Sequence, residues 1–223
     1  MALLLGVDTG GTYTDAVLIR DDKTVEASAK ALTTRQDLAL GISEAIRAVL
    51  QHSGAAPQEV SMAALSTTLA TNALVEGQGG RVALIYIGFK HSDLDRNGLS
   101  EALKGDPALI LGGGHDYAGA EVGALDVAAL QRFLQTEASG VTGFAVAGLF
   151  ATRNPAHELD TARIIAEHTG APVTCSHQLS AKLNGPKRAL TAVLNARLIG
   201  MIDKLIGRMQ DGLLYTSSNP PNR

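Results

Sequence analysis

Apolar and polar positions follow two different periods in the first part of the chain. From residue 3 to residue 32 they alternate, which predicts three strands, at 3–8, 13–20 and 24–32, separated by short turns. Because connections this short join only antiparallel strands, we expect the three strands to be neighbours in one sheet. From Gln36 apolar residues recur at helical spacing, and the helix should end around Ser53.

Farther along the chain, strand and helix patterns alternate. We expect strands and helices in the order 60–65 (strand), 68–75 (helix), 81–87 (strand), 107–111 (strand), 126–137 (helix), 143–149 (strand) and 172–175 (strand). Asn154 and Pro155 provide a cap and a first-turn proline for a further helix before the last of these strands, and Gly170 ends that helix. The longest helical pattern starts at Pro186 and ends near Gly212, with a wide apolar stripe along one side.

This order of elements predicts an α/β fold with a ribonuclease H-like mixed sheet, since three antiparallel strands precede alternating helices and strands. Another α/β sandwich with a leading meander stays open as the alternative. We expect a phosphate-binding subdomain at 1–90, a second α/β portion at 91–212 that ends in the long helix, and a disordered polar tail at 213–223. Because no later segment covers the stripe of the long helix, another domain or subunit should pack on it.

The composition excludes several classes of protein. The 19 basic and 22 acidic side chains are scattered along the 223 residues, so the net charge of −3 gives no electrostatic footprint for nucleic acid. No apolar stretch approaches the roughly 20 residues that a membrane helix needs, and residues 2–5 lack the basic flank of a signal peptide. The single cysteine, Cys175, favours a reducing compartment and a buried apolar role. We therefore expect a cytoplasmic protein without a nucleic-acid or membrane partner.

Candidate chemistry begins at the turn between the first two strands. This segment reads Gly-Val-Asp-Thr-Gly-Gly-Thr-Tyr-Thr-Asp, and it matches neither the P-loop nor the dinucleotide fingerprint. Gly10 and Gly11 would let backbone N–H groups approach a phosphate closely, and Thr12 and Thr14 would add hydroxyl donors. Asp8, at the end of its strand, would hold Mg²⁺ through water, because this ion keeps much of its hydration shell. An ordinary glycine-rich hairpin is the alternative.

A second polar group follows the strand at 60–65. Thr67, Thr68 and Asn72 lie where a strand ends and a helix begins, so hydroxyls and free N–H groups would converge on an anion at the positive helix end. Plain capping of that helix stays open. Arg188 lies on a polar stripe beside the apolar side of the last helix, where it would either line a cleft or face solvent.

Three of the histidines in the second half of the chain are candidates for chemistry. His115 and Asp116 lie in a glycine-rich segment, where they would either bind a metal or substrate or, as we expect, belong to a surface loop. His157 and Glu158 fall in the first turn of a helix, where capping and the helix dipole explain them. His177 directly follows a strand, where it would either take part in acid–base chemistry at neutral pH or fill a hydrogen-bonded structural role.

Four segments resemble motifs of the hydantoinase/oxoprolinase family, and they occur in the same order as in that family. The hairpin at 6–15 is similar to the phosphate-binding hairpin of the actin, sugar-kinase and heat-shock ATPase superfamily, and more closely to the N-terminal domain of that family. The other three are 66–74 (Ser-Thr-Thr-Leu-Ala-Thr-Asn-Ala-Leu), 154–158 (Asn-Pro-Ala-His-Glu), and Ser-His at 176–177 with the stretch 188–196. The resemblance covers the chain up to about residue 200.

The resemblance implies the ATP-binding half of an enzyme that opens a small cyclic amide, a hydantoin or 5-oxoproline, after phosphorylating its carbonyl oxygen. ATP and Mg²⁺ would be the cofactors, with the glycines and threonines of the hairpin and of segment 67–72 as nucleotide contacts. Asp8, Arg188 and His177 would be the catalytic residues. The alternatives are a subunit of an ATP-dependent ketone carboxylase, a sugar-kinase-like phosphotransferase, or a non-catalytic subunit for nucleotide sensing or assembly.

The sequence departs from the family pattern at two places. Ser66 stands where the family usually has glycine, and residues 184–187 stand where an acidic and an aromatic residue commonly precede the arginine. Family members continue into a longer second domain that closes the nucleotide cleft. We therefore expect a C-terminal domain or partner subunit to pack on the last helix, a homo-oligomer, and no activity from this chain alone.

Overall fold

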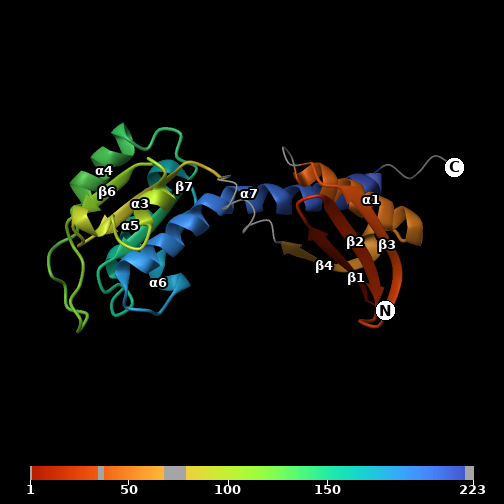
Figure 1. Ribbon diagram of the computed structural model, residues 1–223, viewed down its shortest axis with the longest axis horizontal. Coiled ribbons are helices and arrows are strands. Elements are labelled where there is room, and N and C mark those ends of the chain that lie inside the picture. Colours follow the sequence, from red (N-terminus) through yellow and green to blue (C-terminus); the bar gives the residue numbers. More distant parts are fainter. Residues whose placement is uncertain (1, 35–37, 68–78, 219–223) are drawn as a thin grey trace. The chain divides into compact units, whose positions relative to one another are not determined.

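The computed structural model describes residues 2–34, 38–67 and 79–218 (Figure 1). The chain divides into two units, one formed by residues 1–78 with 202–223 and the other by residues 79–201. Each unit contains one four-stranded sheet, sheet A in the first and sheet B in the second. The division falls earlier than the expected boundary at residue 90, because the strand expected at 81–87 belongs to sheet B.

Sheet A is the mixed sheet that the sequence predicts, with the strand order β3-β2-β1-β4. Its strands are β1 (Leu3–Thr9), β2 (Tyr13–Arg20), β3 (Thr24–Leu32) and β4 (Val60–Thr67). The first three are antiparallel neighbours, as their short connections require, and β4 pairs with β1 in parallel. The expected α/β fold class with a mixed sheet is confirmed.

One helix, α1 (Leu38–Ser53), packs on sheet A. Every second residue of β1 and β2 is buried, among them Leu5 and Leu18, and the helix contributes Ile42 and Ile46 to the same core. The opposite face of the sheet carries the alternate residues, and Met62 there is 55% exposed. The alternation in the sequence is therefore explained by a sheet with one buried face.

Sheet B is entirely parallel, with the strand order β6-β5-β7-β8. Its strands are β5 (Val82–Ile87), β6 (Ala108–Leu111), β7 (Gly143–Gly148) and β8 (Val173–Cys175). All residues of β5 and β7 are buried, which explains why their sequences are continuous apolar runs.

Helices cover both faces of sheet B. The helices α4 (Val127–Thr136) and α5 (Ala156–Thr169) contribute to the core cluster on one face. The first part of α7 (Gly185–Ser218) and α3 (Leu99–Leu103) contribute to the cluster on the other face. In the second unit, Figure 1 shows the strands between these two layers of helices.

Several boundaries differ from the sequence expectation. Pro155 occupies the cap position of α5 rather than its first turn, although the Asn154 side chain still accepts a hydrogen bond from the Ala156 N–H at 3.1 Å. Four short helices of the described residues were not predicted: the 3-10 turns η1 (Pro57–Glu59) and η2 (His91–Asp93), and the helices α3 and α6 (Ser176–Leu179). Helix α7 continues past Gly212 to Ser218. The helix expected at 68–75 lies outside the described residues.

Within the described ranges, no helix combines the length and the apolar character that crossing a membrane requires.

Candidate functional site

The glycine-rich hairpin of the first unit closes on a hydrogen bond from the Gly10 N–H to the Tyr13 carbonyl, at 3.0 Å. Neither Gly10 nor Gly11 has a positive φ, so glycine is not required here for backbone conformation. Close approach is the reason at Gly10, since a Cβ there would lie 3.2 Å from the Tyr13 oxygen. Gly11 and Thr12 form the exposed tip of the hairpin.

Asp8 lies on the exposed face of sheet A, next to two polar partners. The register pairs Asp8 with Asp15 on β2 and with Ser66 on β4, and directly paired residues share a face of the sheet. The Lys30 ammonium lies 3.1 Å from Asp15, so this second carboxylate is already paired with a cation. Asp15, Ser66 and Lys30 were not among the predicted site residues, although the strand alternation places them on the Asp8 face.

The residues present fit a magnesium ion. Asp8 provides an exposed carboxylate, and the hydroxyl of Ser66 and the carboxylate of Asp15 are hard oxygen donors beside it. Mg²⁺ prefers such oxygen ligands and retains several waters, so one or two carboxylates suffice. A bound Mg²⁺ would offset the negative charge of phosphate oxygens at this face.

Thr14 differs from the rest of the predicted phosphate contacts. Its side chain lies on the face beneath α1, is fully buried, and shares a 3.1 Å hydrogen bond with the Thr33 hydroxyl. The Thr14 hydroxyl is therefore on the opposite face of the sheet from Asp8. Thr68 and Asn72 lie outside the described residues, and Thr67 is described only as the last residue of β4.

In the second unit, the polar residues gather at the carboxyl edge of sheet B. The Gly112–Gly114 turn follows β6, α5 begins after β7, and His177 follows β8. In this sheet β6 and β7 lie on opposite sides of β5. Open parallel sheets bind ligands outside the carboxyl ends of their strands, at the point where the strand order reverses in this way.

Glycines allow the loops at this edge to come together. Gly88, which follows β5, has a φ of +77°, and a Cβ on it would lie 2.7 Å from the Gly113 carbonyl oxygen. The Gly88 N–H donates to the Leu111 carbonyl, and the His115 N–H donates to the Leu149 carbonyl. Glycine is required at position 88 because two backbones pack closely at this edge.

Glu158 is the centre of a buried polar cluster, and its side chain has no exposed surface. Its Oε1 accepts hydrogen bonds from the Gly148 N–H at 2.7 Å and from the Ser176 hydroxyl at 2.6 Å. Its Oε2 accepts from the His177 N–H at 3.0 Å and lies 2.5 Å from His177 Nδ1. Glu158 does more than cap α5, because its carboxylate joins β7, α5 and the segment after β8.

The cluster unites two of the predicted catalytic residues. Arg188, 1% exposed, donates from Nε to the Ser176 hydroxyl at 3.3 Å and from Nη2 to the Gly148 carbonyl at 2.8 Å. Desolvation lowers the pKa of Arg188, and the neighbouring Glu158 carboxylate acts in the opposite direction. Arg188 therefore neither lines an open cleft nor faces solvent; it is a buried partner of the Glu158 cluster.

The Glu158 carboxylate also fixes the tautomer of His177. Because the carboxylate accepts, His177 Nδ1 carries the hydrogen and Nε2 is left as an acceptor. The His177 side chain is 17% exposed. A carboxylate that orients a partly exposed imidazole in this way suits it to accept a proton.

The same region does not fit a metal ion. Glu158, Cys175 and His177 bring three ligand atoms within 4.8 Å of one another. Burial raises the pKa of Cys175 to about 12, so the thiol stays protonated, and both carboxylate oxygens already accept hydrogen bonds. Cys175 is 3% exposed, which confirms its expected buried role.

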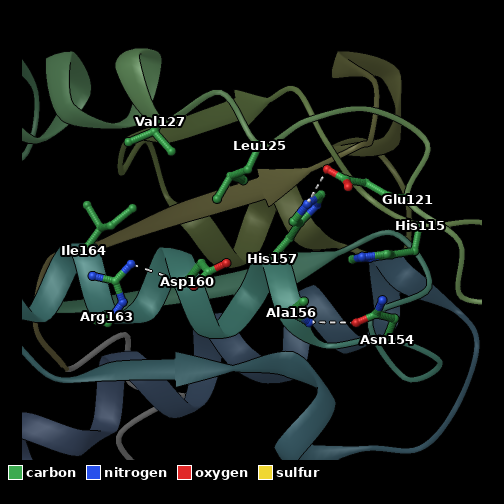
Figure 2. A pocket seen from close by; sticks show the side chains of 10 residues that line it. All are labelled: His115, Glu121, Leu125, Val127, Asn154, Ala156, His157, Asp160, Arg163 and Ile164. Atoms are coloured by element: carbon green, nitrogen blue, oxygen red, sulfur yellow. Dashed lines mark hydrogen bonds and ion pairs between the residues drawn. The ribbon is translucent and has the colours of Figure 1, made fainter.

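A cavity of about 420 Å³ lies beside His115 and His157, as Figure 2 shows. His115 is 3% exposed, so it is not the surface-loop residue expected from the sequence. Its ring lies against the His157 ring, with 4.5 Å between centroids. Burial and His157 lower the pKa of His115, which is therefore neutral at pH 7. Apart from the glycine-rich segment before His115, no pattern in the sequence indicated this pair.

Comparison with known proteins identifies relatives along the whole chain. The Acetophenone carboxylase gamma subunit of Aromatoleum aromaticum is 32% identical, over 94% of this chain and 33% of that protein. The Caprolactamase subunit alpha of Pseudomonas jessenii is 26% identical, over 98% of this chain and 34% of that protein. The chain thus spans about a third of the length of these curated relatives.

Two solved structures share the fold. The ATP-dependent caprolactamase from Pseudomonas jessenii gives a TM-score of 0.75 at 24% identity, over 99% of this chain and 35% of that one. A nucleotide-free acetone carboxylase gives 0.70 at 19% identity, over 97% of this chain and 35% of that one. The family model described as the hydantoinase/oxoprolinase N-terminal region matches residues 4–169, and the chain belongs to that family.

Proposed function

We propose that this chain is the ATP-binding N-terminal part of an enzyme that uses ATP to open a small cyclic amide. The observation that carries the proposal is the hairpin with Asp8 on an exposed sheet face, in a chain of the hydantoinase/oxoprolinase N-terminal family. The relative named caprolactamase supports an amide substrate. Hydantoin, 5-oxoproline and a larger lactam are the candidate substrates.

The proposed chemistry overcomes the low reactivity of an unstrained amide. The ring carbonyl oxygen attacks the terminal phosphorus of ATP, the bond from that phosphorus to the bridging oxygen breaks, and ADP leaves. Water then attacks the activated carbon, the ring C–N bond breaks with a proton passing to the nitrogen, and an acyl phosphate remains. A second water cleaves this acyl phosphate into a carboxylate and inorganic phosphate. The amides of Gly10 and Gly11 and the Thr12 hydroxyl would hold phosphates, and Asp8 would hold Mg²⁺.

The substrate contact in this proposal is His177, and Arg188 supports it from the buried cluster. His177 offers an acceptor nitrogen oriented by Glu158, which suits a base for the attacking water. Arg188 acts through Ser176 and Gly148, which makes it a positioning residue for the same region. The residues proposed at 67–72 would complete the nucleotide contacts.

A second candidate is a subunit of an ATP-dependent ketone carboxylase. The relative named for acetophenone carboxylase is 32% identical, and the caprolactamase subunit is 26% identical. This identity supports a carboxylase subunit as the second candidate. Both reactions would use the same hairpin for ATP. The two reactions differ in the substrate, which is a cyclic amide in the first and a ketone with bicarbonate in the second. Activity with one substrate or the other therefore distinguishes the two candidates.

The test is release of phosphate from ATP by the encoded protein, purified with any subunit that accompanies it. The substrates are hydantoin, 5-oxoproline, caprolactam, and acetophenone with bicarbonate. Release with a cyclic amide supports the first candidate, and release only with the ketone and bicarbonate supports the second. Binding of ATP without turnover of any of them would point to a nucleotide-sensing or assembly subunit.

A variant pair tests the ATP site itself. Asp8→Asn should weaken Mg²⁺-dependent ATP binding by about tenfold or more, because a charged ligand to the hydrated ion is lost. Asp22→Asn, an exposed aspartate at the far turn of the same sheet, is the matched control. Equal binding by both variants, measured by calorimetry, would remove Asp8 from the site.

A further inference from the structure

The cavity beside His115 and His157 lies in the second unit and uses none of the residues assigned to ATP. His115, Glu121, Asn154, His157, Asp160 and Arg163 form most of its polar lining (Figure 2). Its volume of about 420 Å³ falls in the range of small-molecule sites, roughly 300–1,000 Å³. It lies by the loops that follow β6 and β7, where open parallel sheets bind ligands.

The strongest sign of a ligand is the His115 ring. Only 3% of His115 is exposed, and in the described part of the chain its ring nitrogens make no hydrogen bond. These nitrogens are not among the fully buried unpaired atoms, so they keep a small accessible surface, and His115 lines the cavity. A ligand in the cavity would provide the missing partner.

The orientation of His157 limits what that ligand can be. The Gly114 N–H donates to His157 Nδ1 at 2.9 Å, so the ring hydrogen lies on Nε2, which donates to Glu121 Oε1 at 3.1 Å. A metal ion would need the lone pair of Nε2, which this tautomer does not offer. The cavity is therefore suited to an organic molecule rather than to a metal.

The charges around the cavity favour a cation. Glu121 and Asp160 are both carboxylates, and Glu121 is 55% exposed. Arg163 is the cation of the lining, and it is shared between Asp160 at 3.8 Å and Glu167 at 3.1 Å. His115 is neutral and can accept a hydrogen bond, so acceptors and negative charge dominate.

We propose that this cavity binds a small molecule that carries a primary ammonium group. The ammonium would donate to the carboxylate of Glu121 and to the free nitrogen of His115, and the Asp160 carboxylate would add negative charge to the lining. Leu125, Val127 and Ile164 would pack against the aliphatic part of the ligand. Such a ligand is either a simple amine or an amino carboxylate whose acid group lies toward Arg163.

The experiment titrates the full chain with three molecules of four carbons each, butylammonium, 4-aminobutyrate and butyrate. Binding is followed by the ring C–H signals of the histidines in NMR spectra at pH 7.5, with His115→Gln and His157→Gln used to assign the two rings. Saturable shifts of both rings are expected with butylammonium or 4-aminobutyrate and none with butyrate. The first two molecules separate an amine site from an amino-carboxylate site.

Variants locate the binding. The pair Glu121→Gln with Asp160→Asn should weaken binding by about tenfold or more, as the loss of charge-assisted hydrogen bonds predicts. Glu101→Gln, on the exposed surface of α3, should leave the dissociation constant unchanged. Two results would overturn the proposal: no saturable shift of either wild-type ring at about 10 mM, which is ten times a dissociation constant of about 1 mM, or shifts with butyrate as large as with the amines.

Discussion

Sheet A and sheet B both have four strands, yet they bury those strands differently. In β1 buried and exposed residues alternate, whereas every residue of β5 and β7 is buried. The difference follows from coverage, since one helix packs on sheet A and helices cover both faces of sheet B in the described residues. The positions of the candidate functional residues differ between the two sheets for the same reason.

In sheet A the polar residues can lie on a face of the sheet, and Asp8, Asp15 and Ser66 do so. In sheet B no face is available, so polar residues gather at the carboxyl edge, where loops leave the strands. The coverage of each sheet therefore decides whether its candidate site lies on a face or at an edge.

Aspartate substitutions along one strand of each sheet should have the largest effects, and they test whether sheet A has one buried face and sheet B has two. Ala145→Asp and Val146→Asp, consecutive in β7, should each lower the free energy of unfolding of the second unit by about 3–5 kcal/mol, because each buries an unpaired charge. In β1, Val7→Asp should have a similar effect on the first unit. Asp8→Val should change stability by less than about 0.5 kcal/mol.

Hydrogen exchange measured for each unit separately is the suitable readout, because a chain of two units need not unfold in one step. Tolerance of either β7 substitution would contradict burial of both faces of sheet B. A large loss from Asp8→Val would contradict the exposed face of sheet A.

The Glu158 cluster provides the next largest effect. Glu158→Gln should lower the free energy of unfolding of the second unit by about 3 kcal/mol, because the amide NH₂ cannot accept the hydrogen bonds that the carboxylate accepts and Arg188 loses its nearby charge. Glu167→Gln, on the same helix but exposed, should cost less than about 0.5 kcal/mol. Hydrogen exchange of the second unit compares the two. Equal costs would mean that the cluster adds little stability.

Cys175 gives a pH-dependent effect. Burial raises the pKa of its thiol to about 12, above the ordinary value of 9.0, so folding favours the neutral thiol. The resulting stabilisation is complete below pH 9 and is lost as the pH rises from 9 toward 12. Cys175→Ala should flatten the decline of stability over this alkaline range, as measured by thermal unfolding at a series of pH values.

The same thiol should resist alkylation in the native protein at pH 8, since the thiolate is the reactive form. Iodoacetamide labelling followed by mass spectrometry should be at least about 100-fold slower than in the urea-unfolded chain. Comparable rates in the two states would show that the thiol is accessible and its pKa unshifted.

The smallest effect concerns the two hairpin threonines. Thr14→Val removes the hydrogen bond to Thr33 and should cost about 1 kcal/mol of stability without changing the dissociation constant for Mg²⁺ and ATP. Thr12→Val, at the exposed tip, should do the reverse. Calorimetric titration together with thermal unfolding distinguishes them. Weaker ATP binding by Thr14→Val alone would assign the phosphate contact to the buried threonine.

Much of the fold was predictable because short sequence patterns determine most of its strands. The three strands of the meander were predicted within a residue or two, since alternation and tight turns act over a few residues. The continuous apolar runs at β5 and β7 also identified buried strands. The assignment of β5 to the second sheet was not predictable, because strand pairing depends on contacts far apart in the sequence.

The candidate site shows the same division. The sequence identified the hairpin and its Asp8, His177 and Arg188, but it treated Glu158 as a helix cap and His115 as a loop residue. Only the folded chain brings Gly148, Glu158 and Ser176 together, from three elements that local patterns cannot relate.

Local patterns in the sequence are enough to predict most of the strands and helices and to indicate the family that the chain resembles. These properties follow from local periodicity, turn residues and short motifs. The tertiary structure alone decided which polar residues are buried and paired. A carboxylate or an imidazole has the same sequence signal on a surface as in a core, and its charge, tautomer and chemistry depend on the partners that folding brings to it.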